Sequence, residues 1–383
     1  MPSVTDNHRR KGKGKATQEE PASAVLPLGK QLAHTDKKVR DAAINNLTAF
    51  LSNGGITKLS APLEDASGGI VMMADTEDEP ETRHGQLPPV EMRRLWKGLF
   101  YCFWMSDKPL VQQRLATDLS EIILQITPQD EGDDDEEEQG LARDMAALDF
   151  IQGFWETIIR EWVGIDRFRI DKYYMLLRRW INASFRLLAR SSWNPLIVQR
   201  YLAIMVDPST GPLTYENPRT SVSLAWHLAD IWVDELNKVL GDEEILPAPV
   251  PTLLQPFTQL LTRTNNAQTP TRLLPAIYEP ILRAALPLSD PSAARERSAK
   301  RRKTTSSSLE EKRAAVAHIL ERSTSGDDEE RLGRDVLRSM MDEASKPDDV
   351  GVKDVNRRKV YAFVKDWGGV EEEDDNDEEE DDE

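Results

Sequence analysis

An all-α protein, arranged as an irregular helical-repeat bundle of the α-solenoid kind, is the fold that this sequence predicts. Apolar residues recur at spacings of three and four along much of its 383 residues, which is the period of an α-helix. No segment shows the sustained alternation of apolar and polar residues that marks a half-buried β-strand. Successive helical patterns are joined mostly by short turns, so that each helix can bury its apolar face against its neighbours.

The first helix is expected to follow a disordered basic arm. Residues 1–24 are polar and contain the basic run His8–Lys15. The helical-repeat domain is then expected over residues 25–287, opening with a helix over 26–51 that a Gly-Gly pair ends. Within it, the segment Asp36–Leu51 is similar to a repeat helix of the HEAT type, although the repeat period along the chain is irregular.

Two segments of this domain are expected to be disordered loops. Residues 60–88 are rich in Asp, Glu, Pro and Gly, and residues 128–141 hold an acidic run. Between them, apolar residues occupy every face from Leu95 to Met105, which predicts a buried helix. The helices expected after the first are 88–105, 109–126, 141–163, 166–190, 195–206, 220–240, 253–263 and 272–286.

The C-terminal part divides by composition into three segments. Residues 288–308 form a basic, Ser/Thr-rich linker. Residues 309–368 carry helical patterns, the first opened by a capping box in which Ser308 precedes Glu311 by three residues. The helices expected there are 308–322, 329–344 and 352–367. Residues 369–383 are an acidic tail that we expect to be disordered.

The net charge of −18 comes from two short runs of carboxylates. Asp130–Glu138 holds eight of them and Glu371–Glu383 holds twelve; the rest of the chain has 47 acidic and 49 basic residues. Blocks of one charge repel themselves and stay solvated. The body of the protein is therefore close to neutral, and the placement of its charges matters more than their sum.

The sequence offers little for catalysis or for a cofactor. Its single cysteine, Cys102, lies among aromatic residues and is expected to be a buried apolar side chain, and its five histidines show no metal-ligand spacing. There is no phosphate-binding glycine loop and no nucleophile motif. We therefore expect no enzyme activity, no cofactor, no metal and no small-molecule substrate. No stretch has the roughly 18 apolar residues of a membrane span, and no signal peptide is apparent.

Six of the nine tryptophans lie between Trp96 and Trp193, in two dense aromatic blocks. Tryptophan and phenylalanine at helical spacing are more often core than base-stacking platforms, because they bury large apolar areas. Core positions are accordingly expected for Trp96, Phe100, Phe103, Trp155 and Trp162.

One helix separates its charges. Residues 172–206 contain six Lys and Arg and no Asp or Glu. At about 100° per residue, five cations fall on the side opposite the apolar residues of the same helix; they are Arg169, Lys172, Arg179, Arg186 and Arg190. A stripe of one sign attracts a phosphate backbone. We expect this face, the basic stripe, to point outward and to bind RNA, an acidic protein surface, or the acidic loop of the chain itself; an ordinary solvated face is the plain alternative.

Two further basic clusters lie in the segments expected to be disordered. Such clusters are candidate nuclear or nucleolar targeting signals, although they can also be plain solvated charge. Their residues are Arg9, Arg10, Lys11, Lys300, Arg301, Arg302 and Lys303.

Two long aromatic motifs resemble the ribosomal RNA-processing protein 1 family. The first is Leu95–Leu110, with the sequence LWKGLFYCFWMSDKPL. The second consists of Phe154-Trp155, Arg160–Trp162, Gly164–Arg167, Arg169 and Asp171–Leu176. Leu32-Ala33 with Asp36–Asp41 resembles the family's opening helix, and similarity is weaker at Asn356–Tyr361. The resemblance covers about residues 26–240 and is thin from about 247 to 308.

The resemblance implies a non-catalytic, nucleolar factor of large-subunit (60S) ribosome assembly. Such a factor is a helical-repeat scaffold of early pre-60S particles and is needed to mature the precursor of the 5.8S and 25S/28S rRNAs. Its implied partners are pre-rRNA, ribosomal proteins, and other assembly factors that include a WD-repeat and a Brix-domain protein. The competing class is a nuclear transport adaptor or a histone-binding chaperone, which also combines helical repeats with acidic tails.

Overall fold

A computed structural model describes residues 28–32, 34–52, 89–127, 136–286, 313–324, 328–347 and 351–368. These residues are mostly helical and contain no β-strand, only one isolated parallel bridge between Ala248 and Ser323. The all-α prediction is confirmed. The basic arm (1–24), the loop 60–88, the linker 288–308, the acidic tail (369–383) and residues 128–135 of the predicted loop 128–141 lie outside the described residues.

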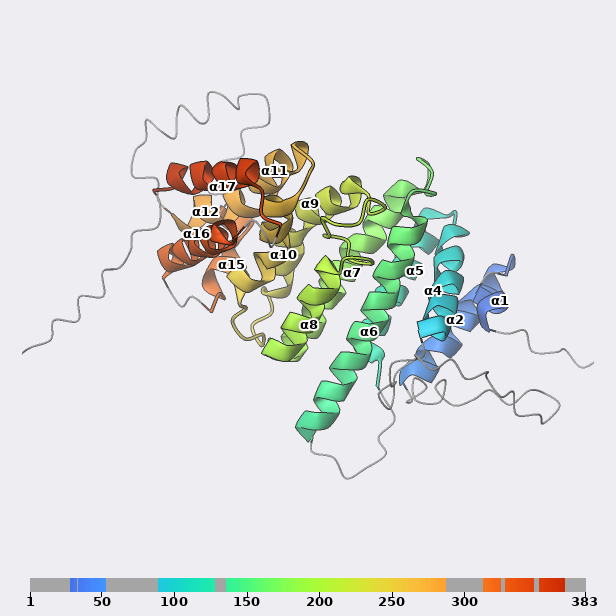
Figure 1. Ribbon diagram of the computed structural model, residues 1–383. Helices are drawn as coiled ribbons and strands as arrows, with labels where there is room; N and C mark the ends of the chain where they lie inside the picture. Colours follow the sequence, from blue (N-terminus) through green and yellow to red (C-terminus); the bar gives the residue numbers. More distant parts are fainter. Residues whose placement is uncertain are drawn as a thin grey trace, which may run out of the picture.

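The helices form two layers (Figure 1). Successive helices of the chain alternate between the layers, so each helix packs within its layer against the next helix but one. One layer consists of α1 (Leu28–Leu32), α4 (Pro89–Trp104), α6 (Glu136–Trp162), α8 (Pro195–Val206) and α10 (Val250–Arg263). The other consists of α2 (Lys37–Ser52), α5 (Pro109–Gln125), α7 (Ile170–Arg190), α9 (Val222–Val239) and α11 (Gln268–Leu273). Contacts between alternate helices are the pattern of an α-solenoid, so the predicted helical-repeat architecture is present.

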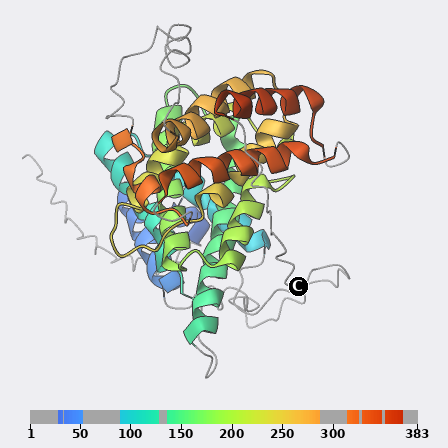
Figure 2. The same ribbon diagram turned by 90° about the vertical axis from the view of Figure 1, so that its left-hand side faces the viewer.

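The C-terminal helices continue this array. They are α12 (Glu279–Ala285), α15 (Ala317–Glu321), α16 (Glu329–Ser345) and α17 (Asp354–Asp366). α16 packs on α10 and α12, and α17 packs on α16 and α10. Figure 2 looks onto this end and shows α16 and α17 side by side across it. The helices that follow the 288–308 segment therefore share one packed body with those that precede it.

Two predicted boundaries are wrong for reasons of helix capping and charge. The helix expected over 26–51 is two helices, because the Asp36 carboxylate accepts the Lys38 backbone N–H at 2.9 Å and starts a new helix there. α6 begins at Glu136 instead of residue 141, so its first turn takes in the end of the acidic run. Carboxylates are favourable at a helix N-terminus, where the macrodipole is positive.

Prolines account for a third difference. The single helix expected over 272–286 is α11, a π-helical turn over Leu274–Tyr278, and α12. Pro275 lies in the π-helical turn and Pro280 in the first turn of α12. Because proline has no N–H to donate, the regular hydrogen-bond ladder cannot pass these positions. By contrast, α8 has the predicted bounds and is capped by Asn194, whose side chain accepts the Leu196 N–H.

The predicted aromatic core is confirmed. Trp96, Phe100, Phe103, Trp155 and Trp162 are all buried. The Trp180 ring stacks on Phe154 at 3.9 Å between centroids, and Trp96 meets Trp180 edge-on at 5.2 Å. Cys102 is buried as expected, and burial raises the pKa of its thiol to about 11.

Gly153 lies where α6 passes closest to Trp96, and its replacement tests how tightly this core is packed. A Cβ at Gly153 would lie 2.5 Å from Cδ1 of Trp96 and 2.6 Å from Cγ of Met92. Overpacking costs about 1–3 kcal/mol, partly offset by the helix propensity of alanine, about 1 kcal/mol above glycine. We expect Gly153→Ala to lower the free energy of unfolding by a net of up to about 2 kcal/mol in urea denaturation.

Gly140 provides the matched control in the same helix. Nothing lies within 4 Å of a Cβ built at this position. Gly140→Ala should therefore be neutral or raise the free energy of unfolding by up to about 1 kcal/mol. Equal effects of the two substitutions would show that the contact between α6 and Trp96 is looser than these distances indicate.

Candidate nucleic-acid interface

The basic stripe of α7 lies along a helix-helix contact. α7 packs on α5, and the paired positions advance together along the two helices, which therefore run parallel. The first turn of α7 follows Asp166, whose carboxylate accepts the backbone N–H groups of Phe168 and Arg169. These bonds order the turn that leads into α7.

Lys172 is the stripe residue whose position differs most from the prediction. Its side chain is buried, and Nζ donates to the carbonyl oxygens of Phe103, Trp104 and Ser106 at 2.7–2.9 Å. The Phe103 and Trp104 carbonyls belong to the last turn of α4 and the Ser106 carbonyl to the turn that follows, so the ammonium caps the end of that helix. Burial, with the nearby Arg169 guanidinium, lowers the pKa of Lys172 to about 8. The expectation of an outward-facing cation is wrong here because α4 ends against this part of α7.

The four arginines of the stripe also have partners within the protein. Arg179 donates to Thr117 Oγ1 at 2.6 Å, and Arg186 pairs with Glu121. Arg190 donates to the Leu124 carbonyl at 2.8 Å and to the buried Asp144 at 2.6 Å. Arg169 pairs with Asp166 and stacks on the Trp104 ring at 4.7 Å.

The stripe therefore joins α7 to α4, α5 and α6, and none of its five cations is without a partner. An acidic partner within the chain was one of the predicted possibilities. Among the described residues, which do not include 128–135 of the acidic run, the carboxylate partners lie on α5, on α6 and in the turn before α7. Arg186 keeps the most accessible side chain of the three ion-paired arginines, 42% exposed. It remains the residue of the stripe that a phosphate could reach most easily.

Further cations, together with Arg169 of the basic stripe, lie beside aromatic rings on the side of the array where α6 turns into α7. Three guanidinium groups stack on aromatic rings in this region: Arg167 on Phe168, Arg169 on Trp104, and Arg272 on Trp226, at 4.7–5.8 Å. The Phe168 ring is 80% exposed. Sequence spacing could not reveal this, because exposure depends on which helices pack nearby.

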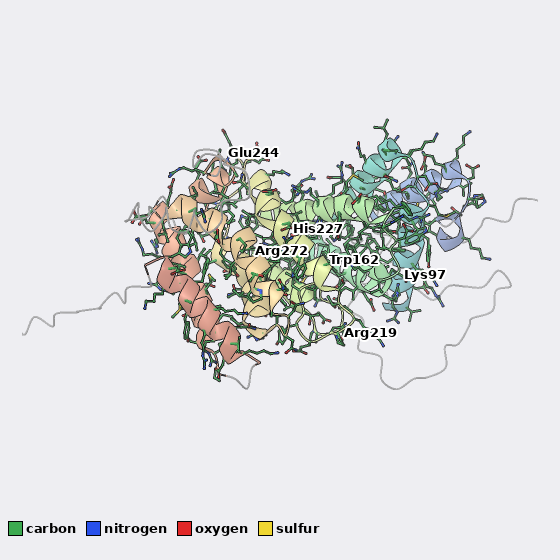
Figure 3. The ribbon with its side chains drawn as sticks, turned by 90° about the horizontal axis from the view of Figure 1, so that it is seen from above. Lys97, Trp162, Arg219, His227, Glu244 and Arg272 are labelled. Carbon is green, nitrogen blue, oxygen red and sulfur yellow. The ribbon has the colours of Figure 1, made fainter. Side chains whose placement is uncertain are left out.

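Aromatic side chains connect α6, α7 and α9 on the same side of the array. Trp162 donates from Nε1 to Ser223 Oγ at 3.2 Å, and its ring lies 5.9 Å from that of Tyr174. The Tyr174 ring in turn lies 4.1 Å from that of His227. Figure 3 views the molecule from this side and shows Trp162, His227 and Arg272 following one another across it. This side of the array therefore carries a row of buried and half-buried rings, with arginines stacked on other rings nearby.

The described residues meet neither the requirements of a metal site nor those of a membrane-spanning helix. Among them there is no group of three or more His, Cys, Asp or Glu side chains placed to hold a metal ion. None of the described helices combines the length and apolar composition that a membrane crossing requires. The basic clusters Arg9–Lys11 and Lys300–Lys303 lie outside the described residues, so their role as targeting signals stays a prediction.

Comparison with known proteins identifies the family. The sequence matches the family described as "Nucleolar protein, Nop52" over residues 23–364. The chain belongs to the Nop52 family. The match spans both layers of the array and reaches into α17, so this family relationship covers the whole described body.

Curated relatives of this Nop52 chain carry one common name. The chain is 29% identical over 259 residues to Ribosomal RNA processing protein 1 homolog B of Homo sapiens. The aligned residues make up 68% of the chain and 28% of that protein. The chain is 27% identical over 265 residues to homolog A of Mus musculus, with 69% and 44% covered. For homolog A of Homo sapiens the identity is 29% over 262 residues, with 68% and 47% covered. The aligned part thus spans less than half the length of each of these relatives.

Proposed function

We propose that this chain is a non-catalytic scaffold of nucleolar ribosome assembly, acting in the pre-60S particle. In this role it is required for processing of the precursor that yields the 5.8S and 25S/28S rRNAs. The observation that carries the proposal is the Nop52 match over residues 23–364, together with relatives named as ribosomal RNA processing proteins. An extended two-layer array suits this work, because it offers long surfaces to several partners at once.

The proposed partners are pre-rRNA, ribosomal proteins, and other large-subunit assembly factors that include a WD-repeat and a Brix-domain protein. The proposed location is the nucleus and nucleolus, reached through the basic clusters Arg9–Lys11 and Lys300–Lys303. The acidic runs would then contact basic ribosomal proteins or limit nonspecific RNA binding.

Within the basic stripe, RNA contact is proposed for the arginines only, because Lys172 is buried against α4. A phosphate at Arg169, Arg186 or Arg190 would have to compete with a carboxylate that already pairs with it. Arg186 is the strongest of these candidates, since exposed ion pairs contribute at most about 1 kcal/mol and are easily exchanged.

Depletion and rescue test this function directly. Loss of the protein should lower mature 25S/28S and 5.8S rRNA, raise their common precursor severalfold on northern blots, and leave 18S rRNA largely unchanged. The full chain should sediment with pre-60S particles, and crosslinking in cells should recover precursor spacer or 25S/28S sequence. Normal precursor ratios, with histones or transport carriers as the recovered partners, would instead support the adaptor or chaperone class.

A further inference from the structure

Helix α17 is unusual in carrying several cations that form no ion pair among the described residues. Arg358, Lys359 and Lys365 have no ion-pair or hydrogen-bond partner among the described side chains. Each other helix of the described chain has at most one such cation; these are Lys30, Lys38, Lys97 and Arg331. Since most basic residues in this fold are paired, three unpaired ones within eight residues form a distinct positive surface.

The unpaired cations flank an exposed aromatic ring. Arg358, Tyr361 and Lys365 follow one another at i, i+3 and i+7, which places them on one stripe of the helix. The two cations are two turns apart, about 10.5 Å along the axis, with the ring between them. Tyr361 is 37% exposed, and Arg358 and Lys365 are exposed as well. Val360 and Val364 are buried, so the stripe faces solvent.

Hydrogen bonds to two neighbouring helices fix the position of α17 and of its exposed residues Arg358, Tyr361 and Lys365. Asn356 donates from Nδ2 to the carbonyl oxygens of Thr262 and Thr264, at 3.3 and 2.9 Å, and so fixes α17 to the end of α10. Arg357 donates to the carbonyl oxygens of Ala344 and Lys346, at 2.8 and 2.9 Å, and fixes α17 to α16. Figure 2 shows α17 at the edge of this end of the molecule. A ligand would therefore meet a surface that needs little ordering on binding.

We propose that the outer face of α17 binds single-stranded RNA. Arg358 and Lys365 contact the phosphates on either side of Tyr361, and a base stacks on the Tyr361 ring. Lys359, about 100° further round the helix, adds to the positive field. An aromatic ring between cations is the pattern of a single-strand site, in which stacking adds to phosphate attraction. An acidic peptide would need the cations alone and would leave the ring unused. This inference rests on the proposed function, for which it names one surface that contacts pre-rRNA.

The salt dependence of RNA binding tests the phosphate contacts. The full chain is titrated with a fluorescent oligouridine of about 20 nucleotides, long enough to span one binding site. For the triple variant Arg358→Gln, Lys359→Gln, Lys365→Gln we expect at least a 10-fold weaker Kd at low salt. We also expect the slope of log K against log salt to be smaller by about 1.4 or more, because each of the two phosphate contacts on a single strand contributes about 0.7.

A second triple variant controls for the change in net charge. The variant Lys30→Gln, Lys38→Gln, Lys97→Gln also removes three positive charges, but from exposed, unpaired positions on α1, α2 and α4. It should change the Kd less than 3-fold and leave the slope nearly constant. Equal losses in the two triple variants would overturn the inference, because RNA binding would then be a property of the overall charge.

Tyr361→Ala separates stacking from charge. It should weaken oligouridine binding about 5-fold or more, in the range of a lost base stack, with an unchanged salt slope. Binding to an RNA duplex should be unaffected, and Tyr361→Phe should restore single-strand binding. An equal effect of Tyr361→Ala on single strand and duplex would contradict the stacking role.

Sedimentation of the same variants distinguishes this inference from the proposed function. If the wild-type chain enters pre-60S particles and the α17 triple variant keeps full RNA affinity, only the α17 surface is wrong. If that variant keeps its RNA affinity but loses an acidic protein partner, α17 is a protein-binding surface instead. If the wild-type chain does not enter pre-60S particles, the proposed function itself is wrong.

Discussion

Replacing Lys172 by methionine is expected to lower the free energy of unfolding by about 3 kcal/mol, a large part of the stability of a domain. The substitution keeps the length of the side chain but removes three hydrogen bonds from a charged donor. The Trp104 carbonyl loses its donor, while the Phe103 carbonyl keeps its bonds from Ser106 and the Ser106 carbonyl keeps the one from Gln112 Nε2. The unpaired Trp104 acceptor costs about 1–3 kcal/mol, and each of the two other lost bonds to the charged group contributes about 1.5–3 kcal/mol. Relief of the cost of burying the ammonium, itself several kcal/mol, offsets part of this loss. Urea denaturation followed by circular dichroism measures the difference.

Lys108→Met is the matched control, because Lys108 lies at the N-cap of α5, is exposed and makes no side-chain cap. It should change the free energy of unfolding by less than about 0.5 kcal/mol. A stability of Lys172→Met within the error of wild type would show that water or a neighbouring donor can replace the ammonium. The Lys172 result also bears on function. A fold weakened at the α4–α7 junction would fail to assemble into particles even if no RNA contact had been removed.

The architecture is largely predictable from sequence because it depends on apolar periodicity. The spacing of Trp96, Phe100 and Phe103 predicts core positions for these rings, and all three are buried. The same reasoning separates the faces of α7 correctly. It cannot say that the polar face also has a neighbour, because a helical wheel describes one helix, while an inner helix of an array is covered on several sides.

Sequence reasoning fails where a local bond or a tertiary contact decides the outcome. Asp36 divides the first predicted helix by capping a new one, and the Pro275 and Pro280 positions interrupt another. The α17 surface is hidden from sequence for a different reason. In sequence, the run Asn356–Tyr361 shows only a weak family similarity, whereas the informative feature is that Arg358 lacks the pairing that Arg357 has.

Glu343→Gln is expected to lower the free energy of unfolding by about 3–5 kcal/mol, at least as much as Lys172→Met. Glu343 on α16 forms an ion pair with Arg263 at the end of α10, and both side chains are only 7% exposed. Glutamine keeps the shape but removes the negative charge that the buried Arg263 guanidinium and Lys346, 2.7 Å from the same carboxylate, both face. Contact with the Tyr215 ring, 5.4 Å away, cannot replace that charge. Thermal or urea unfolding of the full chain measures the loss.

Two further variants show whether this pair unites the C-terminal helices with the array. Glu330→Gln, on the same helix but in an exposed pair with Arg334, should cost less than about 1 kcal/mol. The double variant Arg263→Met, Glu343→Met should recover most of the stability, because apolar residues of similar volume often replace a buried pair without loss. If Glu343→Gln instead released α16 and α17 to proteolysis while the rest of the protein stayed folded, the array would end at α12. The α17 surface would then be carried by a separate unit, whose RNA contact could be gained or lost independently of the scaffold.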